Sequence, residues 1–168
     1  MTKTRTTVLG IDPGLQGAIC VWPYRKQPVL YGLPKEPQQL FWLLADLIRK
    51  EREEDREVEV WVEAQWARPR ASASSTWSLL VPYGKLLMAI EAQGIVPKLV
   101  APQTWKKALS VTKEAHETYE QGKARSIALA KRLRPKLSFR RSEKCTTDCD
   151  GLAEALLIAH YGRQMMSD

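Results

Sequence analysis

Two carboxylic acids in this 168-residue sequence come directly after apolar runs that are typical of buried strands. Asp12 follows the run at residues 8–11, and Glu63 follows the run at 58–62. An ionised carboxylate at the end of a buried strand is costly unless it is paired, hydrogen-bonded or bound to a cation. Asp12 also begins an Asp-Pro-Gly turn, so a purely structural role as a turn residue is the alternative for it.

A second pair of acids, Asp150 and Glu154, lies four residues apart in an apolar segment and therefore shares one face of a predicted helix. The neighbours of Glu154 are alanines and leucines, which is untypical of a surface glutamate. The alternatives are a helix N-cap or first-turn acid for Asp150, and a solvated or locally paired side chain for Glu154. Asp148 is a reserve candidate that also suits the helix cap.

Four acids, two at strand ends and two on a helix, form a set that can bind two divalent cations about 3.5–4 Å apart. Such a pair activates water on one side of a phosphodiester and stabilises the leaving 3′-oxygen on the other. Ligation by carboxylates alone favours Mg²⁺ or Mn²⁺ over zinc. A zinc site is not predicted, because Cys145, Cys149 and His160 have an atypical spacing and lack a fourth ligand.

The elements that position these acids indicate an α/β fold in a single domain over residues 1–168, with a mixed sheet covered by helices. The predicted strands, of which the first two form a hairpin and the third lies at an edge, cover 7–11, 18–22, 29–33, 58–62 and 95–100. The predicted helices cover 38–53, 77–93, 102–109, 122–133 and 148–161. Pro82 indicates a kink in the second helix or a later start of it. If the strands before Asp12 and Glu63 are neighbours, the two carboxylates lie side by side at the edge where such sheets carry their sites.

Composition limits the class of partner. The formal net charge is +7, which favours a polyanion and most commonly a nucleic acid. The sequence contains no apolar run as long as a membrane span and no signal peptide, so no membrane association is expected. Three cysteines argue against a disulfide framework and for a reducing compartment. We therefore expect a cytoplasmic protein that is not secreted.

Five short stretches, in order along the chain, resemble RuvC-type Holliday junction resolvases. They are GIDPGLQGAI at 10–19, VEA at 62–64, VAPQTWK at 100–106, GKARS at 122–126 and DGLAEALLIAHYG at 150–162. The resemblance spans nearly the whole chain and is greatest to the phage and chloroplast branch, whose fourth acid is a glutamate. It implies a ribonuclease-H-like fold, a homodimer, and Mg²⁺ as the cofactor with Mn²⁺ as a substitute. A plastid-type relative would act in an organelle stroma or nucleoid.

Carried over by position, the resemblance implies that Asp12, Glu63, Asp150 and Glu154 are catalytic metal ligands. Some relatives space the last two acids by three residues, which keeps Asp148 as an alternative to Asp150. The implied activity is structure-selective endonuclease cleavage of four-way DNA junctions by paired symmetric nicks, in DNA recombination and repair. The alternatives are a ribonuclease-H-like nuclease on RNA–DNA hybrids or flaps and a junction-binding module without catalysis. An actin-like ATPase would need a longer, two-lobed chain.

Several basic and aromatic residues are predicted to face DNA. The basic residues expected to contact phosphates are Lys106, Lys107, Lys123, Arg125, Arg140, Arg141 and Lys144. Trp66 is predicted to stack on unpaired bases at the crossover, or alternatively to pack under its own loop. Arg68 and Arg70 lie in the same small basic loop and are predicted to contact backbone or bases.

The predicted helix at 77–93 carries apolar residues on more than one side. One face can cover the sheet while another meets a second copy of the chain. A two-fold dimer would present one active site to each of two opposing strands of a four-way junction. The alternative is a helix that is simply buried in the core.

Overall fold

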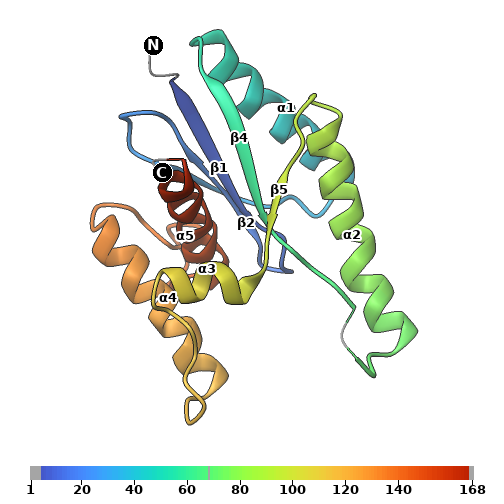
Figure 1. Ribbon diagram of the computed structural model, residues 1–168, viewed down its shortest axis with the longest axis vertical. Helices are drawn as coiled ribbons and strands as arrows, with labels where there is room; N and C mark the ends of the chain where they lie inside the picture. The colour runs from blue at the N-terminus through green and yellow to red at the C-terminus, as the bar shows by residue number, and fades with distance from the viewer. Residues whose placement is uncertain (1–4, 68, 167–168) are drawn as a thin grey trace.

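The computed structural model describes residues 5–67 and 69–166, which form a five-stranded mixed sheet flanked by helices (Figure 1). The strands are β1 (Thr6–Asp12), β2 (Ala18–Trp22), β3 (Val29–Gly32), β4 (Glu57–Glu63) and β5 (Lys98–Val100). The helices are α1 (Pro37–Glu53), α2 (Ala73–Glu91), α3 (Pro102–Ala108), α4 (Tyr119–Leu133) and α5 (Asp150–Met165). The predicted α/β class and mixed sheet are confirmed. None of the helices in the described ranges is long and apolar enough to cross a membrane.

The order of the strands brings the two strand-end acids together. The sheet runs β3-β2-β1-β4-β5, with β1 antiparallel to β2 and parallel to β4. Ile11 pairs with Val62, so Asp12 and Glu63 are the next residues of two neighbouring parallel strands. The prediction that these two strands are neighbours is therefore confirmed.

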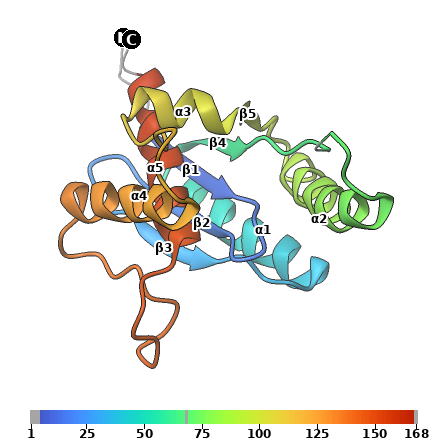
Figure 2. The same ribbon diagram turned by 90° about the horizontal axis from the view of Figure 1, so that it is seen from below.

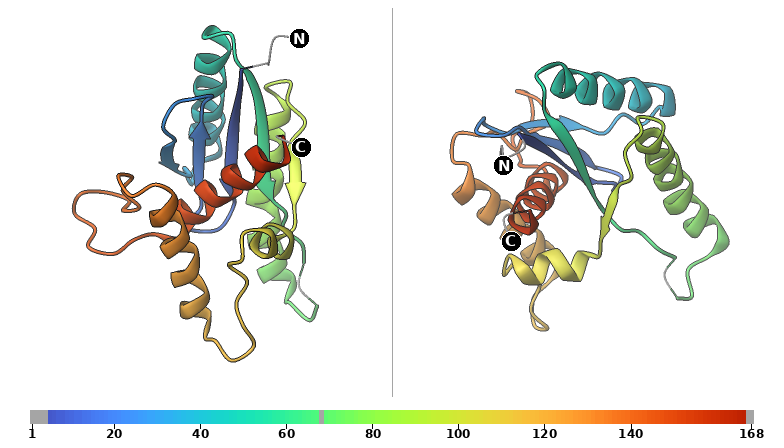
Figure 3. Two further views of the ribbon diagram at one scale, coloured as in Figure 1. Left: turned by 60° about the vertical axis from the view of Figure 1, so that its left-hand side comes forward. Right: turned by 45° about the horizontal axis from the view of Figure 1, so that its top comes forward.

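Helices cover the two faces of the sheet in separate groups, which Figure 2 and the right-hand view of Figure 3 show. Side chains alternate between the faces because the strand repeat is two residues. Leu9 and Ile11 point toward α1 and α2, whose buried residues include Leu44 and Leu86. Val8 points to the opposite face, where α3, α4 and α5 pack.

Helix α5 lies directly on β1 because two glycines leave room for it. A Cβ atom on Gly10 would stand 2.2 Å from the backbone nitrogen of Ala159. A Cβ atom on Gly151 would stand 2.0 Å from the carbonyl oxygen of Gln16, in the loop that follows Asp12. This close contact places the first turns of α5 beside the carboxyl end of β1.

Two helices begin earlier than predicted because their caps lie further back in the chain. Helix α2 begins at Ala73 instead of residue 77, since the Ser72 hydroxyl oxygen accepts a hydrogen bond from the backbone N–H of Ser75. The later start suggested by Pro82 is therefore wrong, and the helix continues through it. Helix α4 begins at Tyr119 instead of residue 122, where a Thr-x-x-Gln capping box precedes it.

Two further boundaries differ from the prediction. Helix α5 begins at Asp150, and its N-cap is Cys149, so the interpretation of Asp148 as the cap is wrong. Strand β5 begins at Lys98 instead of residue 95, and it pairs with only the last three residues of β4.

Candidate active site

Asp12 is the last residue of β1, and its side chain is nearly enclosed. Its Oδ1 accepts a hydrogen bond of 3.0 Å from the backbone N–H of Gly14, so the turn role and a site role coincide in this residue. Burial is the largest cause that raises the pKa of Asp12, and the charges of Glu154, Glu63 and Asp150 act in the same direction. Against the lowering effect of the Gly14 hydrogen bond, they together bring this pKa to about 7. The carboxyl group thus lies where its ionised form needs a cation.

Glu63 is the last residue of β4 and is 7% exposed. The indole Nε1–H of Trp105, a fully buried residue of α3, donates a hydrogen bond of 2.9 Å to Glu63 Oε2. The amide of Gln65 donates a longer one, 3.3 Å, to Oε1. Burial raises the pKa of Glu63, and the charge of Glu154 raises it further, while the Trp105 hydrogen bond acts in the opposite direction. A hydrogen bond from α3 thus fixes one oxygen of the Glu63 carboxylate.

The two acids of α5 each face a lysine from another helix. Glu154 Oε1 lies 2.8 Å from Lys106 Nζ of α3 and accepts a hydrogen bond of 3.1 Å from the Ser126 hydroxyl of α4. Asp150 Oδ2 lies 3.1 Å from Lys123 Nζ of α4. Each of the two acids is therefore charge-compensated by a lysine from a neighbouring helix.

The reserve candidate points elsewhere. Asp148 Oδ2 lies 2.5 Å from Lys131 Nζ on α4. The charge of Asp150, by contrast, raises the pKa of Asp12. This arrangement favours Asp150 as the third acid of the set.

The four acids form a common electrostatic site, with Lys106 as an internal counter-ion. Burial disfavours the charge on Lys106, but the charges of Glu154, Glu63 and Asp12 outweigh it and raise its pKa. Within residues 5–67 and 69–166, no three acidic, histidine or cysteine side chains converge closely enough to hold a metal ion as the side chains stand. The donors nevertheless fit a hard divalent cation in chemistry, since all are carboxylate oxygens and, within the described residues, Asp12 forms no direct ion pair with a lysine or arginine.

The predicted DNA contacts separate into two groups. Lys106 and Lys123 lie against the acids, whereas Arg125 pairs with Glu117 and Glu114, in the segment before α4. Lys107 is exposed on α3.

The loop after β4 holds three further residues that are predicted to face DNA. Trp66 is 51% exposed, so packing under its own loop is not what the structure shows. Arg70 is exposed, and Arg68 lies outside the described residues. The loop therefore presents an aromatic ring and a basic side chain to solvent just beyond Glu63.

Among the other predicted phosphate contacts, Arg141 is exposed but hydrogen-bonded to another loop. Its Nη2 donates a hydrogen bond of 3.2 Å to the carbonyl oxygen of Gly17, which ties the segment before α5 to the loop after Asp12. Arg140 and Lys144 are exposed in that same segment.

Two residues of the site were missed by sequence reasoning, Trp105 and Ser126. Both lie in stretches that resemble the resolvases, VAPQTWK and GKARS. Their place in these two stretches was the one signal that could have identified them. A buried side chain that donates a hydrogen bond to a distant carboxylate produces no periodic pattern in the sequence.

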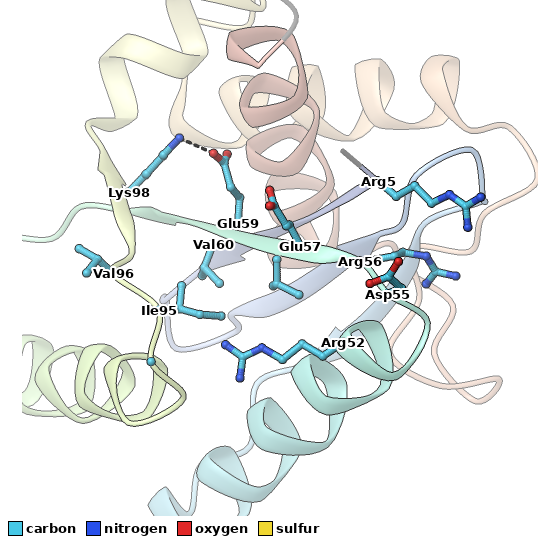
Figure 4. A pocket seen from close by; sticks show the side chains of 12 residues that line it. Arg5, Arg52, Asp55, Arg56, Glu57, Glu59, Val60, Ile95, Val96 and Lys98 are labelled. Carbon is cyan, nitrogen blue, oxygen red and sulfur yellow. Dashed lines mark hydrogen bonds and ion pairs between the residues drawn. The ribbon is translucent and has the colours of Figure 1, made fainter. Parts of the chain in front are cut away.

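A hollow of about 990 Å³ lies at the other end of β4 (Figure 4). It is lined by the first residues of β4, by the 94–96 segment and by basic side chains such as Arg52. Lys98, on its rim, is paired with Glu59. The hollow and Glu63 are at opposite ends of the strand. The four candidate acids, Asp12, Glu63, Asp150 and Glu154, therefore do not line the hollow.

No protein-family model matches the chain, and no curated protein matches it in sequence. Among solved structures it is similar to T. thermophilus RuvC in complex with a Holliday junction substrate, with a TM-score of 0.51 and 16% identity over 95% of this chain and 96% of that one. A second T. thermophilus RuvC structure gives a TM-score of 0.49 with 18% identity, over 96% of this chain and 97% of that one. The yeast mitochondrial Holliday junction resolvase Ydc2 gives 0.48 with 16% identity, over 98% and 82%.

The first of these similarities shows the fold. The chain has the fold of RuvC, a ribonuclease-H-like mixed sheet flanked by helices, as the sequence predicts. The resemblance to the phage and chloroplast branch stays a prediction.

Proposed function

We propose that this protein is a divalent-metal-dependent endonuclease that resolves four-way DNA junctions by paired nicks, in DNA recombination and repair. The observation that carries the proposal is the placement of four acids, from β1, β4 and α5, around one end of the sheet, where the charges of three of them raise the pKa of the buried Asp12. Acids gathered in this way are typical of nucleases that hydrolyse phosphodiesters with metal ions. The RuvC structure with the same fold holds a Holliday junction substrate.

The residues that would hold the cation are Asp12, Glu63, Asp150 and Glu154, with Mg²⁺ or Mn²⁺ as the ion. When bound there, it supplies the Lewis acidity that activates a water for attack on a phosphodiester. The chain itself orients the acids: Trp105 and Ser126 donate hydrogen bonds to two of them. Lys106 provides positive charge at the same point, where a phosphate would approach.

The substrate side of the proposal rests on charge and on an exposed aromatic ring. A net charge of +7 favours a nucleic acid, and Lys123, beside Asp150, and the exposed Lys107 of α3 are suited to phosphate contacts. Trp66, half-exposed three residues after Glu63, is suited to stacking on bases that lose their partners at a crossover.

A homodimer is part of the same proposal. Helix α2 buries Tyr83, Leu86 and Ile90 against the sheet but leaves Trp77 and Met88 each 71% exposed. A pair of such helices around a two-fold axis would bury these side chains and set two active sites across a symmetric junction.

The experiment is cleavage of a labelled four-way junction beside a linear duplex, an RNA–DNA hybrid and a flap, in EDTA, Mg²⁺ or Mn²⁺. Asp12→Asn and Glu154→Gln serve as matched controls that keep side-chain shape. Paired, symmetric, metal-dependent nicks in the junction that are lost in both variants are expected. Cleavage of the hybrid or the flap, but not of the junction, would show a ribonuclease-H-like nuclease that acts on those substrates. Tight junction binding without any cleavage would make it a binding module.

A further inference from the structure

Two consecutive residues of α3 hold two acids that belong to different elements. Trp105 donates its indole N–H to Glu63 on β4, at 2.9 Å. Lys106 lies 2.8 Å from Glu154 on α5. The short helix α3 therefore connects the strand end and the helix that carry these carboxylates.

The position of α3 depends on strand pairing immediately beside Glu63. Val100, the last residue of β5, pairs with Glu63, and its carbonyl oxygen accepts a hydrogen bond of 2.8 Å from Ala64 N–H. Helix α3 begins two residues later, at Pro102. Trp105 is fully buried in the core with Val100, so its ring has little freedom to move relative to Glu63.

The indole group imposes a defined orientation on the carboxylate. An indole N–H can only donate, so its one hydrogen bond is used on Glu63 Oε2. The other oxygen, Oε1, receives only the longer contact of 3.3 Å from Gln65 among the described hydrogen bonds. The terminal torsion of a free glutamate is broad, so a buried donor on one oxygen decides where the second oxygen points.

We propose that Trp105 is a positioning residue, whose N–H holds Glu63 in the orientation in which it binds a divalent cation. The proposal rests on the proposed function in one respect, that Glu63 is a metal ligand. Groups that orient metal ligands by hydrogen bonds typically contribute about 10–100-fold to metal affinity.

The chain offers a matched control on the same strand. Trp61 also donates its indole N–H to a glutamate oxygen, Oε2 of Glu59, at 3.1 Å. Glu59 pairs with Lys98 and is not one of the four acids. Trp105→Phe and Trp61→Phe therefore remove the same group and the same kind of hydrogen bond, once inside the site and once outside it.

The first test is binding of Mn²⁺ to the protein without DNA, measured by titration calorimetry. Trp105→Phe is expected to bind about tenfold more weakly, whereas Trp61→Phe binds as the unchanged protein does. In junction cleavage, Trp105→Phe should need a correspondingly higher Mn²⁺ concentration for half-maximal rate, with most of the maximal rate recovered at saturation. Melting curves in EDTA show whether each variant is folded.

A spectroscopic test does not depend on a variant that folds. The chain has six tryptophans, so its ¹⁵N-labelled form gives a small set of indole N–H signals. The signal of Trp105, assigned from its contacts with neighbouring core protons, should shift as Mg²⁺ is added. The Trp61 signal should stay in place.

Each outcome has a distinct meaning. Equal Mn²⁺ affinity of Trp105→Phe and the unchanged protein, or a Trp105 signal that does not respond to Mg²⁺, would overturn the positioning role while leaving the nuclease function intact. An unchanged protein that binds no divalent ion would instead contradict the proposed function itself.

Discussion

Charged side chains are buried at both ends of the sheet, but they are paired with opposite charge at one end only. At the amino-terminal end of β1 and β4, Glu51 Oε2 accepts hydrogen bonds from the Thr7 hydroxyl at 2.6 Å and from Arg56 Nη1 at 2.5 Å. All three residues are buried. The negative charge is thus paired and hydrogen-bonded within the protein.

At the carboxyl-terminal end, the buried charges are of one sign. Asp12 receives a backbone hydrogen bond from Gly14, and the largest charge effects on its pKa come from three other acids. The lysines that compensate Glu154 and Asp150 are each nearly 30% exposed, so solvent and ligands reach them. The negative charges at this end are therefore only partly compensated by positive side chains of the protein.

The contrast separates a stabilising network from the proposed functional one. A buried ion pair that loses one partner destabilises a protein strongly, whereas like charges in a buried site are typical of groups kept for binding or catalysis. The end with Glu51 and Arg56 stabilises the fold, whereas the end with Asp12 carries uncompensated acids, as the proposed metal-dependent function would require.

The largest expected effect is the loss of cleavage in Asp12→Asn. The substitution keeps the shape of the side chain but removes the charge that would bind the cation, so several kcal/mol of transition-state stabilisation are lost. We expect junction cleavage to fall by at least about 10³-fold, measured in single-turnover assays. A variant that keeps a tenth of the rate would remove Asp12 from the metal-binding set.

Arg56→Ala should produce the opposite pattern, a large loss of stability without loss of metal binding. It leaves Glu51 buried without its cation, which costs about 3–5 kcal/mol in the free energy of unfolding, measured in urea. Arg49→Ala, which removes exposed ion pairs with Asp46 and Glu53, should change stability little. Similar stabilities of the two variants would contradict the distinction between the ends.

The free energy of unfolding should depend on pH through Asp12, at the carboxyl-terminal end of the sheet. The pKa of Asp12 is about 7 in the folded protein against 3.8 for the ordinary group, so the folded state binds more protons between these values. In EDTA, the free energy of unfolding should therefore fall as the pH rises from about 4 to about 7, with a contribution from Asp12 of about 4 kcal/mol. Asp12→Asn should show a flatter profile in denaturant titrations. Parallel profiles for the two proteins would contradict the raised pKa.

The smallest expected effect is on the affinity for junction DNA and its dependence on salt. Lys123→Ala, near the acids, should weaken junction binding and lower the slope of log affinity against log salt by about 0.9. Arg52→Ala, at the hollow on the opposite end, should leave the slope unchanged. Binding is measured in EDTA so that cleavage does not interfere. Equal losses at both ends would mean that DNA does not select the acidic end.

The sequence alone was sufficient for the parts of the site that depend on local pattern. Apolar runs that stop at Asp12 and Glu63 predict strand ends, and the spacing of Asp150 and Glu154 predicts a shared helical face. Helix starts were less accurate, because caps such as Ser72 lie in polar segments. The start of α4 was also predicted three residues late, although the Thr-x-x-Gln capping box before it is a signal that the sequence contains.

Only the tertiary structure decided which side chains the acids meet. The indole of Trp105 reaches Glu63 across 42 positions of sequence, and the hydroxyl of Ser126 reaches Glu154 across 28. The tertiary structure also pairs Lys106 and Lys123 with Glu154 and Asp150, whereas it pairs Arg125 with Glu117, which is not one of the four acids. Local periodicity determines which face of an element is buried, but the partner of a buried polar group depends on how separate elements pack, and this is encoded in no single segment.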